Sequence, residues 1–264
     1  MTRLTPTRSP LLTASALLCL HATRLFAQPS PTAAAAFNAY TQAIEARLAQ
    51  QHRSSANFLS VDADPQALAR LRNGEVILEN LTPAHAETSG SLLHHWRATA
   101  FAPGATAADF ERLLSDFNAY PKNFSPEVLQ ANLISQHDGH TFATMRVRQR
   151  HVITVLMDTD YDITFGRLDT HHGYSISQST RISELDPKTG RALTPGEEHG
   201  FLWRLNTYWS YEERDGGLYL QIESVSLTRA IPTGLGWVIG PYIESIPRES
   251  LDFTLRSAVT AIRK

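Results

Sequence analysis

Cysteine is almost absent from this chain, which has only one, Cys19, in 264 residues. A single cysteine excludes an internal disulfide framework and a cluster of thiolates around a metal. Excess charge is absent too, because 24 Lys and Arg against 26 Asp and Glu give a formal net charge of −2. Domains that bind nucleic acid usually carry a clear positive excess, so we expect no nucleic-acid partner.

Motifs that would identify a reaction are also absent from the sequence. No Gly-x-Ser-x-Gly elbow occurs. The pairs His94-His95 and His171-His172 are adjacent, and adjacent side chains of a strand point to opposite faces, so neither pair can chelate a metal. The glycine-rich run 234–240 lacks the glycine spacing and the βαβ context of a nucleotide-binding loop. We therefore expect no metal and no cofactor.

The first 27 residues have the order of a secretory signal peptide. Arg3 and Arg8 come first, an apolar run follows over 11–20, and the small residue Ala27 ends the segment. The run of about ten residues is too short to span a bilayer. We expect cleavage after Ala27 and a mature protein that is periplasmic or secreted. No later run is long enough to span, so we expect no stable membrane insertion after cleavage. A lipid on Cys19 or a retained anchor fits this pattern less well.

Residues 28–89 are predicted to form an N-terminal extension of helix plus strand. Apolar residues recur at spacings of three and four over 33–52, which predicts an amphipathic helix. Its polar face has no basic bias, so we expect it to pack on the protein and not on a membrane. A second short helix is expected over 65–72, and a strand over 75–81.

Residues 90–264 change to a pattern dominated by strands, with one internal helix capped by Thr106 and one long helix at the end. The pair Asp138-Gly139 and the run 215–217 are signals of tight hairpin turns. The final helix is expected to begin near Pro247. The expected strands are 92–101, 128–137, 140–150, 152–165, 174–185, 201–214 and 218–229. Strands joined by tight turns and covered by helices predict an α+β fold with an antiparallel sheet.

Several segments together resemble the START-like superfamily, also called SRPBCC or the polyketide-cyclase and lipid-transport superfamily. The similar segments are 108–121, 200–209, 219–232, 234–240 and 246–251. The resemblance implies a helix-grip fold over 90–264, in which a curved antiparallel sheet wraps around a long C-terminal helix. It also implies a hydrophobic cavity between sheet and helix. Members of the superfamily bind lipids, sterols, polyketides or plant hormones, and some catalyse cyclisation or hydrolysis in that cavity.

Polar residues alternate along the last two expected strands and are candidates to bind the polar end of a ligand. Alternate residues of a strand share one face, and arginine suits a carboxylate or phosphate. The candidates are Arg204, Asn206, Tyr208, Gln221, Glu223 and Arg229. The alternative places this set on the solvent face, with Arg204 and Glu223 as a cross-strand pair. Trp237 and Ile239 are expected to form the lips of a mobile glycine-rich loop at the cavity mouth, or else a tight structural connection.

Two functions of different classes follow from these expectations. The first is an exported protein that holds a lipid or another hydrophobic small molecule in the cavity. The second is a cyclase-, aromatase- or hydrolase-like enzyme, for which Glu223 or Tyr208 would supply the acid or base. A scaffold whose cavity is filled by its own side chains is a third alternative. The sequence shows no strong acid–base constellation, which favours binding over catalysis. It does not predict the oligomeric state.

Overall fold

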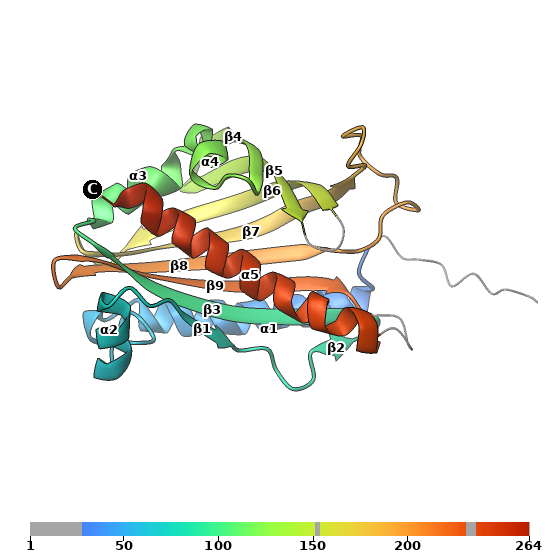
Figure 1. Cartoon of the computed structure of the whole chain (residues 1–264). Coiled ribbons are helices and arrows are strands. Elements are labelled where there is room, and N and C mark those ends of the chain that lie inside the picture. Colours follow the sequence, from blue (N-terminus) through green and yellow to red (C-terminus); the bar gives the residue numbers. More distant parts are fainter. Residues whose placement is uncertain (1–27, 151–153, 231–235, 264) are drawn as a thin grey trace, which may run out of the picture.

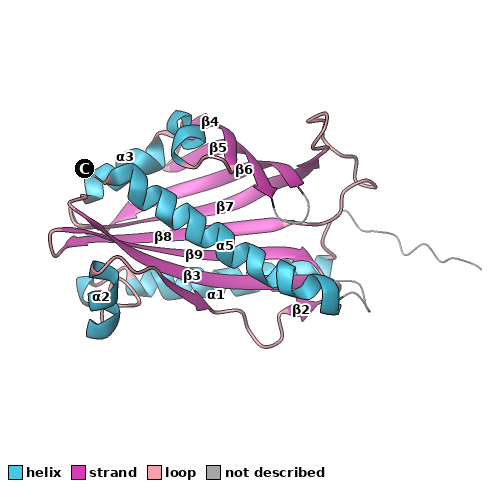
Figure 2. Cartoon of the chain, viewed as in Figure 1, coloured by secondary structure: helices cyan, strands magenta, loops and turns pink. Residues whose placement is uncertain are grey.

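A nine-stranded antiparallel sheet forms the centre of the protein. The computed structural model describes residues 28–150, 154–230 and 236–263, without the side chains of residues 236–244. The strand order is β1-β3-β9-β8-β7-β6-β5-β4, and β2 pairs with β3 off this path. The strands are β1 Ile77–Asn80, β2 Glu87–Thr88, β3 Ser91–Pro103, β4 Val128–His137, β5 His140–Arg150, β6 Thr154–Arg167, β7 His172–Leu185, β8 Arg204–Arg214 and β9 Gly217–Arg229. Figures 1 and 2 show that the sheet is curved and twisted.

Helices cover both faces of this sheet. The long helix α5 lies across one face, and α1 lies behind the strands on the other (Figure 1). The helices are α1 Pro31–Gln51, α2 Pro65–Arg72, α3 Ala107–Ser115, α4 Tyr120–Asn123 and α5 Gly236–Ile262, with single 3-10 turns at Ser55–Asn57 and Phe117–Ala119. Among the described residues, no helix is long and apolar enough to cross a membrane. The predicted α+β helix-grip architecture is confirmed.

The predicted hairpins form with tight two-residue turns. Asp138 and Gly139 join β4 to β5, and Asp215 and Gly216 join β8 to β9. All four residues have positive φ angles, of 52° and 81° in the first turn and 56° and 73° in the second. Two consecutive left-handed residues match the right-handed twist of the flanking strands, which is why Asp-Gly pairs favour such turns. These turns fix the register that decides which side chains share a face.

The helix α5 differs from its prediction at its start. It begins at Gly236, nearly three turns before the similar segment 246–251, so Pro247 lies in its interior and not near its first residue. Residues 236–240, predicted as a loop, are therefore helical. An interior proline removes one helix hydrogen bond. Proline is also common at the first position of a helix, which is why the local sequence predicted a start there. Burial of Leu251 and Leu255 against the sheet is a tertiary contribution that offsets this loss.

The N-terminal segment packs on the outer face of the sheet, which is the face away from α5. Phe37, Ile44 and Leu48 of α1 are buried against Tyr208 and Val225 of the sheet. The short strand β1 pairs with β3 and so extends the same sheet. The boundary between residues 89 and 90 stays a prediction. The helix expected over 33–52 packs on the protein, as the absence of a basic bias on its polar face predicted.

Candidate functional site

A cavity of about 250 Å³ lies between the inner face of the sheet and α5. Strands β5 to β9 form its floor, residues 246–254 of α5 form one wall, and the segment from α3 to β4 closes one end. Pockets for small molecules usually measure roughly 300–1,000 Å³, so this cavity is close to the lower end of that range. The fold therefore leaves a space at its centre that the described side chains do not fill.

Most of the cavity wall is apolar. Large apolar side chains from the sheet, from α4 and from α5 line it. Examples are Phe124, Met145, Ile163, Leu205, Trp209 and Leu251. Phe165 and Phe201 also line it and remain 43% and 39% exposed, so apolar surface continues from the cavity to the solvent. An apolar ligand that enters would bury surface of its own and of these residues, which is favourable at roughly 25 cal/mol per Å².

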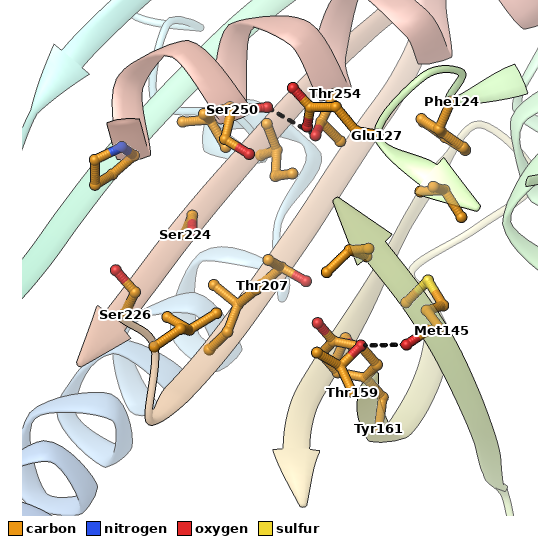
Figure 3. Close-up of a pocket in the computed structure, with 18 of the residues that line it drawn as sticks. Phe124, Glu127, Met145, Thr159, Tyr161, Thr207, Ser224, Ser226, Ser250 and Thr254 are labelled. Atoms are coloured by element: carbon orange, nitrogen blue, oxygen red, sulfur yellow. Dashed lines mark hydrogen bonds between the residues drawn. The ribbon is translucent and has the colours of Figure 1, made fainter. Parts of the chain in front are cut away.

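A row of hydroxyl groups crosses the cavity floor. Ser177 of β7 pairs with Thr207 of β8, and Thr207 pairs with Ser224 of β9, so the three side chains lie side by side on one face. All three line the cavity. Figure 3 shows Thr207 and Ser224 on neighbouring strands of the floor. Within the described part of the chain, these hydroxyls make no side-chain hydrogen bond, so they are available to a ligand.

Glu127 is the one acidic or basic side chain among the described residues that line the cavity. It sits between α4 and β4, where its backbone N–H donates to the Phe124 carbonyl at 3.1 Å and its carbonyl accepts from the Arg148 N–H at 2.7 Å. Burial raises the pKa of its carboxyl group to about 7, although a hydrogen bond with Ser250 opposes the shift. A carboxyl group with that pKa is present in both protonation states near neutral pH.

Polar groups of α5 and β5 gather around the same wall. The Gln149 amide donates to the Ser250 hydroxyl at 3.3 Å, and the Thr254 hydroxyl donates to the Ser250 carbonyl at 2.8 Å. In Figure 3, Glu127, Ser250 and Thr254 lie together, across the pocket from Thr207. Polar groups thus line the cavity both at the wall with Glu127 and along the floor, among mainly apolar side chains.

A curved antiparallel sheet that holds a long C-terminal helix, with a cavity between the two, is the arrangement that defines the helix-grip architecture. The chain has the START-like, helix-grip fold. That resemblance, suggested by segments of the sequence, is thereby confirmed at the level of the fold. The arrangement of sheet, helix and cavity carries this assignment.

Comparisons with known proteins report matches among solved structures. A STAR-related lipid transfer protein from Xanthomonas axonopodis is 15% identical, with 71% of this chain and 99% of that chain covered and a TM-score of 0.46. Human STARD10 is 11% identical, with 76% and 79% covered and a TM-score of 0.45. The Zhui aromatase/cyclase from Streptomyces sp. R1128 is 10% identical, with 64% and 91% covered and a TM-score of 0.42. No protein-family model and no curated protein matches the sequence.

The START-like fold places the predicted polar residues away from the cavity. Thr207 and Trp209 of β8 and Ser224 of β9 line it, and the residues between them point to the opposite face. Six residues were predicted to face the cavity, and none of them is among its described lining residues: Arg204, Asn206, Tyr208, Gln221, Glu223 and Arg229. The expected inward orientation is therefore wrong. Strand alternation separates the two faces but does not say which one turns toward α5.

Four of these residues are buried on the outer face of the sheet, beneath the N-terminal segment. The Tyr208 hydroxyl donates to Glu45 of α1 at 3.0 Å, and the Asn206 amide donates to Tyr208 at 3.3 Å. The Ser60 hydroxyl donates to Gln221 at 2.6 Å. The solvent-face alternative is also wrong for these residues, because residues 28–89 cover them. Their polar groups are used in joining that segment to the sheet.

Glu223 is the centre of an ion cluster on this outer face. It is 0% exposed, and its Oε2 accepts from Arg47 at 2.5 Å and lies 3.1 Å from the His95 Nε2. Arg97 Nη1 lies 3.6 Å from its Oε1, and the Tyr40 hydroxyl lies 2.9 Å from the His95 Nδ1. Burial alone would raise the pKa of Glu223, but the bonds with His95 and Arg47 hold it below its usual value. Neither Glu223 nor the nearby Tyr208 is therefore placed to act as acid or base in the cavity.

The two predicted arginines make other contacts. Arg204 donates to the Trp203 carbonyl at 2.8 Å, so the predicted pair of Arg204 with Glu223 is replaced by the cluster around Arg47. Arg229 donates to the His199 carbonyl at 3.3 Å. Trp237 and Ile239 belong to the first turns of α5, and their side chains lie outside the described residues. Their proposed place at the cavity mouth stays a prediction.

Sequence reasoning missed Glu127 and the hydroxyl row. Glu127 follows Ser125-Pro126 at a turn before β4, and no spacing links it to the residues of α5 that it meets. The hydroxyl row had a signal, because the turn at Asp215-Gly216 sets Thr207 opposite Ser224. No three described His, Cys, Asp or Glu side chains gather in a way that could hold a metal ion.

Proposed function

We propose that this protein binds a hydrophobic small molecule or lipid in the cavity between the sheet and α5. The open, mainly apolar cavity is the observation that carries the proposal. It also weighs against a pure scaffold, whose interior its own side chains would fill. Each methylene group that a ligand buries contributes roughly 0.8 kcal/mol, so a short alkyl chain or a ring system supplies useful affinity without any charged contact.

We further propose that the protein is exported and works in the periplasm or outside the cell. The support lies in the sequence of residues 1–27, with its basic start, apolar run and small terminal residue. Expression in the native host should give a mature chain that starts at Gln28. N-terminal sequencing of the exported fraction tests this, and an uncleaved chain found in the cytoplasm would overturn it.

The first test of binding is native mass spectrometry of the protein purified from its own host, followed by solvent extraction. A discrete extra mass that extracts as an apolar compound supports the proposal. Thr207→Trp, which fills the cavity floor, should remove that mass. Thr180→Trp is the matched control, because Thr180 is exposed on β7 and does not line the cavity. A wild-type protein that stays empty after exposure to lipid mixtures would refute binding.

Glu127 supports a second candidate function, a cyclase-, aromatase- or hydrolase-like reaction in the same cavity. A general acid or base works best with a pKa near the operating pH, and burial raises the pKa of this carboxyl group to about 7. The extracted ligand can be returned to the protein and followed by mass spectrometry. Conversion by the wild type that Glu127→Gln abolishes, with binding retained, would establish catalysis. A ligand recovered unchanged from both proteins leaves binding as the function.

A further inference from the structure

The charge on the cavity wall limits which ligands the cavity can hold. Among the described lining residues Glu127 carries the only charge, and that charge is negative when it ionises. The neighbouring cation Arg148 lies on β5 between Val147 and Gln149, which line the cavity, and is itself absent from the lining. A buried carboxylate or phosphate needs a cation or several N–H donors to offset its lost hydration. The described cavity wall offers an anionic ligand no such cation.

The hydroxyl row offers a neutral oxygen what it needs. A serine or threonine hydroxyl both donates and accepts, so it can bond to an alcohol or to a carbonyl. Ser177, Thr207 and Ser224 lie on three adjacent strands and make no side-chain hydrogen bond to other described residues. Ser177 is buried, Thr207 and Ser224 are half-buried, and all three line the cavity, so a ligand there with oxygen atoms of its own can bond to them.

We propose that the cavity selects a neutral, mainly apolar ligand with an alcohol- or carbonyl-type oxygen, which bonds to the row of Ser177, Thr207 and Ser224, while Glu127 disfavours carboxylate and phosphate groups. This inference rests on the proposed binding function and adds the chemical class of the ligand. The row supplies the attractive contact, and Glu127 supplies the repulsive one. Specificity commonly needs both kinds of contact.

The test compares 1-decanol with decanoate, which share a ten-carbon chain and differ in the charge of the polar end. Both compete at pH 8 with Nile red, a neutral apolar dye whose fluorescence reports cavity occupation. We expect decanol to bind at least about tenfold more tightly than decanoate, since a tenfold ratio needs only a modest difference in binding free energy. Equal affinities for the two, or tighter binding of decanoate, would overturn the inference.

Variants separate the two contacts. Glu127→Gln should tighten decanoate binding by about tenfold and change decanol binding by less than about twofold, because only the anion meets the lost charge. Glu87→Gln is the matched control, since Glu87 is exposed on β2 and away from the cavity. Thr207→Val with Ser224→Ala should weaken decanol binding by about threefold to tenfold, once each competition curve is corrected for the affinity of the dye for that variant. Variants that leave the decanol-to-decanoate ratio as in the wild type would contradict the assignment.

The outcomes also separate this inference from the proposed function. If Nile red and decanol both bind but charge makes no difference, the binding function stands and the ligand class is wrong. If neither Nile red nor either ten-carbon probe binds, the cavity function itself fails and takes the inference with it. If Thr207→Trp binds Nile red as tightly as the wild type does, the probes bind elsewhere on the protein, which also refutes the inference.

Discussion

The carboxylate of Glu223 on β9 accepts a hydrogen bond of 2.5 Å from the guanidinium group of Arg47 on α1. This contact joins the N-terminal helix to the outer face of the sheet, opposite the cavity. The next residue on β9, Ser224, lines the cavity. Neighbouring residues of one strand thus serve two different tasks, because their side chains point to opposite faces.

Replacing Glu223 should affect stability and leave ligand binding intact. Glu223→Gln removes the anion that faces Arg47, His95 and Arg97, and breaking a buried ion pair costs roughly 3–5 kcal/mol. Chemical denaturation at pH 7 should show this loss, while Nile red affinity stays within about twofold. Ser224→Ala is the matched change on the other face. It should leave the unfolding free energy near the wild-type value and weaken Nile red binding. A Glu223 variant of normal stability and weakened binding would contradict this division.

The same variant predicts a pH dependence. The pKa of Glu223 is lower in the folded protein, so its contribution to stability is present above the unfolded value of about 4.5 and is lost as the pH falls through the folded value. The difference in unfolding free energy between wild type and Glu223→Gln should therefore be largest at pH 6–7 and shrink below about pH 4. A difference that does not change over that range would argue against an ionised Glu223.

Glu127 should contribute to stability with the opposite pH dependence to that of Glu223. Its pKa is raised by burial to about 7, so the folded protein binds its proton more tightly than the unfolded chain does. Stability from this group is present below the unfolded pKa of about 4.5 and is lost as the pH rises through about 7. Relative to wild type, Glu127→Gln should gain about 1–2 kcal/mol between pH 5 and pH 8, after allowance for partial solvent screening. Denaturation curves at both pH values measure this, with Glu87→Gln as the control.

Two buried histidines should make the protein sensitive to mild acid. Burial lowers the pKa of His52 to about 4, with a further contribution from Arg47, and burial lowers the pKa of His94 to about 4. Each stays neutral in the folded state, so stability is lost as the pH falls from about 6.5 to about 4. His52→Gln should remove up to about 3 kcal/mol of this pH-dependent loss. His85→Gln, at an exposed position, should leave the pH profile unchanged.

The turn between β8 and β9 should be sensitive to any side chain at its second residue. Gly216 has a φ of 73°, and a left-handed conformation costs a residue with a Cβ roughly 1–2 kcal/mol. Gly216→Ala should lower the unfolding free energy by about this amount. Gly196→Ala is the control, since Gly196 lies in an exposed loop without a positive φ and has open space around it. Equal effects of the two changes would mean that the turn does not hold the hairpin.

The sequence predicted most of the fold because local signals fix strands, turns and helix stripes. The turn at Asp138-Gly139 and the helix over 65–72 are found where they were expected. The long strands were expected to within a few residues. The start of α5 was wrong, because Pro247 is locally a signal for a helix start and only burial against the sheet allows it inside the helix.

The candidate site was the part that the sequence predicted least well. Alternation along β8 and β9 correctly placed Tyr208 and Glu223 on a common face of the sheet, and the assignment of that face to the cavity was wrong. Both faces of this sheet are covered, one by α5 and the other by α1, so neither shows the exposed, polar pattern that would identify it as outer. No sequence pattern predicted that Glu127 lines the cavity, because its contact with Ser250 joins segments that are distant in the chain.

The order of the elements, the α+β class and the pairing of the hairpins could be predicted from local sequence patterns, because each depends on residues close together in the chain. Long-range packing sets which face of the sheet encloses the cavity and which face binds the N-terminal helix. It also decided that Glu127, and not Glu223, is the carboxyl group in the cavity. These outcomes depend on packing between segments more than a hundred residues apart, and no local pattern encodes them.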